Sequence, residues 1–204
     1  MKTRVVKIFL YFLIFLIPSV FLWININQHY NRFISLSAFS ITARYYDLTI
    51  ESIEEKEGYI IFKIKNALPM QDLYGKGRDF EMEISLDMEA VTFNIPMTVS
   101  ILLAILLASN LGWKKRWEIF YTGLLLLFLL HMASMLLYSL CAIKEIAQNS
   151  GPYVAYYINR HLTAPHILCV LKDFLINYAA RFEPFLIALY AWVEIKKRAH
   201  QIPS

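Results

Sequence analysis

Residues 5–24 of this chain read VVKIFLYFLIFLIPSVFLWI, an apolar run interrupted only by Lys7 and Pro18. Because a helix rises about 1.5 Å per residue, such a run covers roughly 30 Å, the thickness of the hydrocarbon core of a bilayer. A secretory signal peptide also starts with basic residues, but it ends in small residues, whereas Trp23 and Asn25 stand here. The run therefore predicts an uncleaved membrane anchor. The composition agrees, since 58% of the 204 residues are hydrophobic and 18% are charged.

Three further segments are apolar enough to be predicted as membrane spans. Residues 95–111 begin with Pro96 in the first helical turn, and residues 117–140 follow after a short basic turn, so the two predict a helical hairpin. The last span is expected over residues 173–198, because its clean apolar stretch, 184–193, is too short to cross a bilayer. The predicted fold class is a membrane α-helical protein with four transmembrane helices.

The basic residues predict the orientation of these spans. Three clusters flank alternate ends of the four spans: Lys2/Arg4/Lys7, Lys114/Lys115/Arg116 and Lys196/Lys197/Arg198. The positive-inside rule places all three in the cytoplasm, together with both termini, and leaves residues 25–94 and 141–172 outside. Residues 25–94 hold seven Lys and Arg against eleven Asp and Glu, a net charge of −4, whereas the rest holds thirteen against five, a net charge of +8. This asymmetry indicates membrane orientation rather than binding of nucleic acid.

Residues 25–94 are predicted to form a small extracytoplasmic α+β domain, inserted between the first two transmembrane helices. Residues 29–44 have a near-helical spacing of apolar side chains, which indicates an interfacial helix. Residues 48–54 and 58–65 are short β-type runs, and the polar residues 54–58 between them have the composition of a hairpin connection.

One strand of this domain is predicted to have an apolar face and an acidic face. Its apolar residues alternate with polar ones, and the apolar set is Phe80, Met82, Ile84, Leu86 and Met88. Glu81 and Glu83 lie on the opposite face, where they can pair with Lys63 and Lys65 of the neighbouring strand. So small a domain buries little core alone. The apolar face is therefore expected to rest on the helix over 29–44, on the membrane surface, or on a partner protein, and it is the candidate partner-binding face.

Three ionisable residues fall in one layer of the predicted bundle: His131, Arg181 and Glu183. Counted from the cytoplasmic boundary, Glu183 and Arg181 lie roughly 18 and 21 Å deep, and His131 reaches a similar depth. Ionisable groups in a membrane face a partner, a cavity or water, because each costs about 2.5 to 3.5 kcal/mol to insert. Arg181 and Glu183 are about 200° apart on a helix, so their partners lie elsewhere. They form an intramembrane polar contact, within the bundle or to another protein, or they snorkel to a wet outer leaflet.

Cys141 and Cys169 admit three interpretations. Arg160 and His166 lie near Cys169 in the sequence, and a thiolate activated by such neighbours is the nucleophile of a membrane transpeptidase. The two thiols can also form an external disulfide or pack inertly in apolar helices, and inert packing is the favoured interpretation. No histidine pair has zinc-binding spacing, so no catalytic residue, cofactor or metal ligand is assigned.

The segment Val91-Thr92-Phe93-Asn94-Ile95-Pro96 leads into an Ile/Leu/Ala helix that closes with Leu107-Ala108-Ser109. Together with the single anchor ending at Trp23 and the external β-rich segment, this arrangement resembles the exosortase-associated small membrane proteins, of the exosortase H-associated type. The resemblance implies a place in the bacterial inner membrane beside an exosortase, the transpeptidase that processes proteins bearing a C-terminal sorting signal. It implies no catalytic residue.

The expected function is a non-catalytic accessory or assembly partner in an envelope protein-sorting or export system of the exosortase type. Its partners would be the lipid bilayer and a membrane protein, the sorting transpeptidase. One alternative is a Cys-dependent membrane transpeptidase or protease. Another is a small transporter or sensor subunit, although the four spans do not show the repeated half-bundles of transporters.

Overall fold

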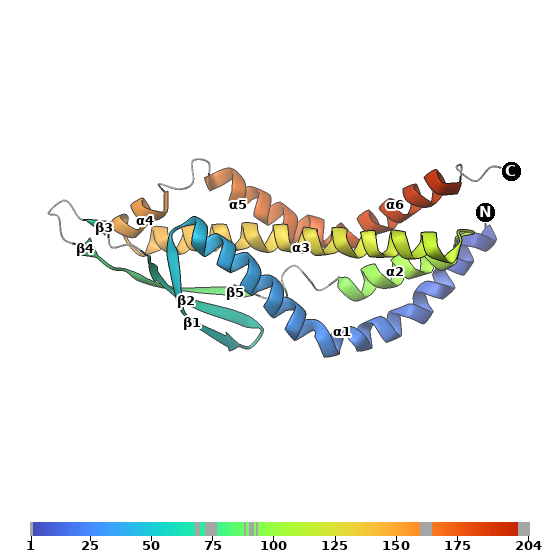
Figure 1. Cartoon of the computed structure of the whole chain (residues 1–204), viewed down its shortest axis with the longest axis horizontal. Helices are drawn as coiled ribbons and strands as arrows, with labels where there is room; N and C mark the ends of the chain where they lie inside the picture. Colours follow the sequence, from blue (N-terminus) through green and yellow to red (C-terminus); the bar gives the residue numbers. More distant parts are fainter. Residues whose placement is uncertain are drawn as a thin grey trace. The chain divides into compact units, whose positions relative to one another are not determined.

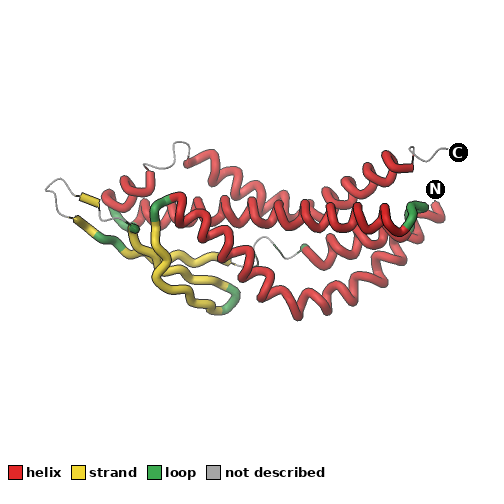
Figure 2. Tube along the Cα trace, in the orientation of Figure 1, coloured by secondary structure: helices red, strands yellow, loops and turns green. Residues whose placement is uncertain are grey.

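The protein is predominantly helical, and its described strands form a small three-stranded sheet and a two-stranded one (Figures 1 and 2). The computed structural model describes residues 2–67, 70–71, 77–87, 89, 92, 94–159 and 165–199. The helices are α1 (Lys2–Tyr45), α2 (Ile95–Leu107), α3 (Trp113–Asn149), α4 (Pro152–Asn159), α5 (Pro165–Phe174), a π-helical turn (Leu175–Ala179) and α6 (Ala180–Ala199). The strands are β1 (Leu48–Lys56), β2 (Tyr59–Asn66), β3 (Met70–Gln71), β4 (Gly77–Arg78) and β5 (Glu81–Asp87).

The chain divides into two compact units, to which α1 and α3 both contribute. Unit 1 comprises Met1–Gln28, Thr92–His131 and Asn177–Ser204, and unit 2 comprises His29–Val91 and Met132–Ile176. The domain predicted over residues 25–94 is thus not a compact unit by itself, because residues 132–176 belong to the same unit as the sheet. A sheet of this size cannot bury enough apolar surface alone, so helices must cover it.

Among the residues that the structure describes, two helices are long and apolar enough to cross a membrane, over Val5–Tyr45 and Trp113–Asn149, and Ile95–Leu107 is a shorter apolar helix. Helix α1 joins the predicted anchor and the predicted helix over 29–44 without a break. The polar residues between them do not end the helix, and the Asn25 side chain instead donates to the Phe21 carbonyl oxygen at 2.7 Å. The mostly helical fold with candidate membrane helices and a small sheet is thereby confirmed, whereas the set of four spans stays a prediction.

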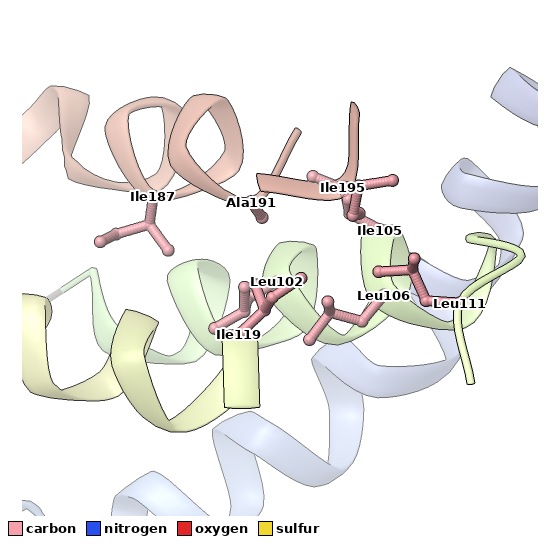
Figure 3. Close-up of a cluster of buried hydrophobic side chains, with 8 residues drawn as sticks. All are labelled: Leu102, Ile105, Leu106, Leu111, Ile119, Ile187, Ala191 and Ile195. Carbon is pink, nitrogen blue, oxygen red and sulfur yellow. The ribbon is translucent and has the colours of Figure 1, made fainter. Parts of the chain in front are cut away.

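The core of unit 1 joins α2, α3 and α6. Figure 3 shows its eight buried side chains, Leu102, Ile105, Leu106, Leu111, Ile119, Ile187, Ala191 and Ile195. Gly123 of α3 permits a close approach to α2, because a Cβ atom there would lie 2.9 Å from Leu102 Cδ2. Small residues serve membrane helices in this way, since lipid gives helices no hydrophobic reason to associate and close packing takes its place.

The sheet of unit 2 is antiparallel in the order β1-β2-β5. The predicted hairpin is confirmed, but its turn is shorter than expected. Only Glu57 and Gly58 form it, at φ 49° and 85°, while residues 54–56 belong to β1. Positive φ at both positions suits the twist of a two-residue hairpin loop. The expected cross-strand register also holds, with Lys63 opposite Glu83 in β5.

The apolar face of the sheet packs against helices within unit 2. Phe39 of α1 stacks on Phe62 of β2, with ring centroids 3.8 Å apart, and Phe80 meets Tyr157 of α4 edge to face. The Tyr157 hydroxyl donates to the Asp47 carbonyl oxygen at 3.0 Å. Of the three covers that the sequence allowed for this face, the helix over 29–44 is one that the structure provides, and α4 adds a second that the sequence did not suggest.

Candidate functional site: a buried carboxylate in unit 1

Glu183 is a carboxylate buried in unit 1, where side chains from three helices meet. Its side chain and that of His131 are each 1% exposed, and Glu183 Oε2 lies 2.8 Å from His131 Nε2. The Thr98 hydroxyl donates to the other oxygen, Glu183 Oε1, at 2.7 Å. Thr98 belongs to α2, His131 to α3 and Glu183 to α6, so one carboxylate ties three helices together.

The Thr98 hydroxyl can donate to Glu183 because the backbone amide of Thr98 already donates to the nearest carbonyl oxygen of its own helix. The Thr98 amide donates to the Asn94 carbonyl oxygen at 3.0 Å, and the hydroxyl lies 3.0 Å from the same oxygen. A hydroxyl has one hydrogen to donate, and the amide already satisfies Asn94. The hydroxyl hydrogen is therefore available for Glu183. Ser100, the next polar residue of α2, makes the same kind of backbone bond within its own helix, to the Pro96 carbonyl oxygen at 2.6 Å.

A carboxyl group and an imidazole that share a hydrogen bond can be buried together without adding net charge to the bundle. Either the proton rests on the carboxyl and both groups are neutral, or it rests on the imidazole and the two form an ion pair. A lone charge at this depth costs a few kcal/mol, and a partnered group avoids most of that cost. The arrangement therefore suits a polar clamp between helices.

Arg181 does not take part in this clamp. Its side chain is exposed, as are those of Phe182 and Phe185. The separation of about 200° that two residues make on a helix puts Arg181 opposite Glu183. The structure thus brings together two of the three ionisable residues that the sequence placed in one layer, and it leaves the third facing away from the interior of unit 1.

Thr98 is the member of the cluster that the sequence analysis missed. The signal was present, because Thr98 lies in the first turn of an apolar helix, near the same end of the predicted bundle as the ionisable layer. Hydroxyl residues in apolar helices commonly bond to their own backbone, as Ser100 does, so a threonine carries little information alone. Only the packing of α2 against α6 gives Thr98 a partner on another helix, which Ser100 is not seen to have among the described residues.

The candidate partner-binding strand face is covered within this chain. Four of its side chains are buried in unit 2, Phe80 (9% exposed), Met82 (5%), Ile84 (0%) and Leu86 (0%), and Met88 lies outside the described residues. A face covered by the chain's own helices does not offer itself to a partner. Periodicity shows that a strand has an apolar face, but it does not identify what covers that face.

The two cysteines form a disulfide, with Cα atoms 5.5 Å apart, which corrects the favoured interpretation of inert thiols. The bond joins α3 to α5 within unit 2, where Lys172 Nζ also lies 3.6 Å from Glu145 Oε1. A thiolate nucleophile requires a free cysteine. The side chains of Arg160 and His166, its suggested neighbours, lie outside the described residues. Within the described part of the chain, no group of three or more His, Cys, Asp or Glu side chains has metal-binding geometry.

Comparison with known protein families identifies the family to which the chain belongs. The profile of the exosortase H-associated membrane proteins matches residues 2–193, nearly the whole sequence. The chain belongs to this family. The resemblance drawn from the anchor and from the entry to the second span is thereby confirmed, and the exosortase H-associated protein is a membrane protein. Neither a curated protein nor a solved structure matches it.

The family assignment gives the local sequence pattern a structural meaning. In this exosortase H-associated protein, Asn94 occupies the N-cap position of α2 and Pro96 lies in its first turn. Proline is tolerated there because the first amides of a helix have no partner within it. The same first turn of α2 carries Thr98, four residues after Asn94, and its bond with Glu183.

Proposed function

We propose that this protein is a non-catalytic accessory partner of an exosortase-type sorting transpeptidase in the bacterial inner membrane. The observation that carries the proposal is the family match over residues 2–193. The disulfide between Cys141 and Cys169 supports it indirectly, because it occupies both thiols that a Cys-dependent transpeptidase would need. Catalysis would then belong to the partner, and this chain would bind or position it.

The proposed topology has four spans, with both termini and the three basic clusters in the cytoplasm. Residues 25–94 and 141–172 would lie in the periplasm. Two independent features agree on this orientation. The basic clusters lie at alternate ends of the spans, and the cysteine pair falls on the side predicted to be external, where disulfides form and persist.

Within this role, the clamp of Thr98, His131 and Glu183 would hold α2, α3 and α6 in one arrangement. Arg181 would be the contact to the partner, because it is a charged residue of α6 whose side chain is exposed. A cation exposed at this depth gains most from an acidic or hydrogen-bonding group on a neighbouring protein. The N-terminal part of α1 also offers an apolar surface, since Ile17 is 77% exposed and Phe21 is 71% exposed.

Site-specific photo-crosslinking in cells that contain the exosortase tests the association. A crosslinking amino acid at Ile17 or Phe21 is expected to trap the exosortase. The same amino acid at Ile187, which is 5% exposed in the core of unit 1, is the matched control and is expected to trap none. Deletion of the gene is expected to reduce processing of a protein that bears a C-terminal sorting signal. Normal processing in the deletion strain, together with the absence of any exosortase adduct, would refute the proposal.

The contribution of Arg181 is tested by co-purification from the same membranes. We expect Arg181→Leu to lower the yield of the complex several-fold and Arg181→Lys to retain most of it, because the contact needs the positive charge. Since Arg181 is exposed, neither change should lower the amount of the accessory protein in the membrane. If Arg181→Leu leaves the yield of the complex unchanged, the side chain only snorkels towards water.

A further inference from the structure

Helix α2 is too short to span a bilayer alone, and it leaves a groove beside it in unit 1. Its thirteen residues, Ile95–Leu107, cover about 20 Å, compared with about 30 Å of hydrocarbon core. The groove lies among α1, α2 and the first turns of α3, and its volume is about 180 Å³. The residues that line it are Phe15, Leu103, Leu106, Leu107, Trp113, Arg116, Trp117 and Phe120.

The walls of this groove are apolar, and Arg116 is the one charged residue among those that line it. Trp113 and Trp117 meet edge to face, with ring centroids 5.3 Å apart, at the start of α3. Tryptophans of this kind lie at the level of the lipid headgroups. An apolar cavity of about 150 Å³ suffices to bind a benzene ring, so this groove accommodates a segment of an acyl chain.

That residue, Arg116, is held in place by the loop that follows α2. Its Nε donates to the Leu111 carbonyl oxygen at 2.8 Å, and its Nη2 donates to the Ser109 carbonyl oxygen at 2.7 Å. Nη1 takes part in neither bond. The guanidinium group is therefore oriented before any ligand arrives, and it keeps N–H groups with which to bind an oxyanion.

The charges around Arg116 favour an anion. Lys114 and Lys115 precede it in the first turn of α3, and Glu118 is the one carboxylate in the following turn. Glu118 forms an ion pair with Arg198 of α6, so its charge is already balanced. A second groove of unit 1, lined by Val5, Ile8, Phe9, Phe12, Met97, Ile101, Pro184 and Phe185, is apolar throughout and offers no cation. Both grooves have apolar walls, and of the two only the groove beside α2 has a basic residue among its lining residues.

We propose that the groove beside α2 binds one anionic glycerophospholipid of the membrane, with an acyl chain against Leu103 and Leu107 and the phosphate against Arg116. This inference goes beyond the accessory role and rests on unit 1 alone. With the basic clusters in the cytoplasm, the lipid comes from the inner leaflet. The lipid fills the space that the short helix leaves, and its phosphate neutralises Arg116 at the end of α2.

The test is lipid retention by the purified full-length protein, measured by native mass spectrometry with dioleoylphosphatidylglycerol and dioleoylphosphatidylcholine in turn. The wild type is expected to bind the anionic lipid more tightly. Arg116→Gln is expected to reduce that preference roughly five-fold, the effect of one basic group near a phosphate. Lys197→Gln, which removes a charge that does not line the groove, is the control for general electrostatic attraction.

A second pair of variants separates the site from the stability of the protein. Leu107→Trp fills the groove beside α2 without touching Arg116, and it is expected to weaken binding of both lipids. Met97→Trp fills the groove that lacks a cation and is expected to leave retention of the anionic lipid unchanged. Equal retention of the two lipids by the wild type, or equal effects of Leu107→Trp and Met97→Trp, would overturn the proposal.

Discussion

At the scale of single residues, Glu183 shows how a membrane bundle accommodates a carboxyl group. Two hydrogen-bonding partners from two other helices, Thr98 and His131, meet its two oxygens. Each oxygen thus receives a contact of 2.7 or 2.8 Å in a place where water is excluded. The cost of removing the group from water is offset only while both partners are present, so the effect of a substitution depends on what it leaves behind.

We expect the double variant His131→Leu/Glu183→Leu to be more stable than either single variant. Each single change leaves one buried polar group without its main partner, which costs about 3 kcal/mol, whereas the double change replaces the pair by apolar groups. Thermal unfolding in detergent micelles measures the difference. Arg181→Leu, two residues from Glu183 but exposed, is the matched control and should unfold close to the wild type. Additive losses in the double variant would contradict the clamp.

At the scale of elements, the contact between α2 and α3 depends on the absence of a side chain at Gly123. We expect Gly123→Leu to destabilise unit 1 by about 1 to 3 kcal/mol, the usual effect of overpacking, because its Cβ alone would lie 2.9 Å from Leu102 Cδ2. The change in midpoint temperature in micelles measures this loss. Gly112→Leu is the control, since nothing lies within 4 Å of a Cβ atom at that position. Equal effects of the two substitutions would contradict close packing at Gly123.

The hairpin of β1 and β2 carries an exposed ion pair whose titration has a definite sign. The hydrogen bond from Lys63 lowers the pKa of Glu54, and the same bond raises the pKa of Lys63. The Glu54 contribution to stability is therefore present above the ordinary carboxyl pKa and is lost as the pH falls through the lowered value. The Lys63 contribution is present below the ordinary lysine pKa and is lost as the pH rises through the raised value.

Titration of the Glu54 carboxyl by NMR in micelles tests this pair. We expect Lys63→Met to raise the pKa of Glu54 towards its ordinary value. Lys65→Met should leave the pKa of Glu54 in place, because Lys65 pairs with Glu51 instead. Added salt should reduce the shift of the Glu54 pKa in the wild type, because exposed ion pairs are screened by salt. A Glu54 pKa that responds equally to both substitutions would contradict the register of the ion pairs.

At the scale of the whole molecule, the disulfide links stability to the compartment in which the chain folds. It closes a loop of 28 residues, and the chain-entropy relation gives about 3 to 4 kcal/mol for a loop of this length. We expect Cys141→Ser, Cys169→Ser and the double variant to unfold at the same lowered temperature, because each loses the same bond. A reductant should bring the wild type to that level and should leave the variants unchanged.

The redox state of the cysteines in cells also tests the proposed orientation. If residues 141 and 169 face the periplasm, a thiol-alkylating reagent added to the denatured wild-type protein is expected to modify these cysteines only after reduction. In a strain without periplasmic thiol oxidation, both cysteines should be modified directly. Free thiols in ordinary cells would contradict both the disulfide and the external placement of this segment.

The sequence predicted the features that depend on residues close to one another in the chain. Hydropathy and helical length identified the apolar spans, and two-residue periodicity identified β2, β5 and their register, because these patterns are local. The layer that holds His131 and Glu183 could also be located, since depth along a helix is a matter of counting residues. The anchor and the helix over 29–44 were predicted as separate elements, although a helix tolerates the polar residues between them and α1 continues through them.

The sequence by itself determined that this is a membrane protein of the exosortase H-associated family, with an anchor, a hairpin-containing segment and one layer of ionisable residues. Only the tertiary structure decided which partners these parts take. It covered the apolar face of β5 with helices of the same chain, joined Cys141 to Cys169, and selected Thr98 for Glu183 while it excluded Arg181. The physical reason is that side-chain periodicity specifies the direction of a face within its own element, whereas its partner depends on residues that are distant in the sequence and meet only after the helices pack.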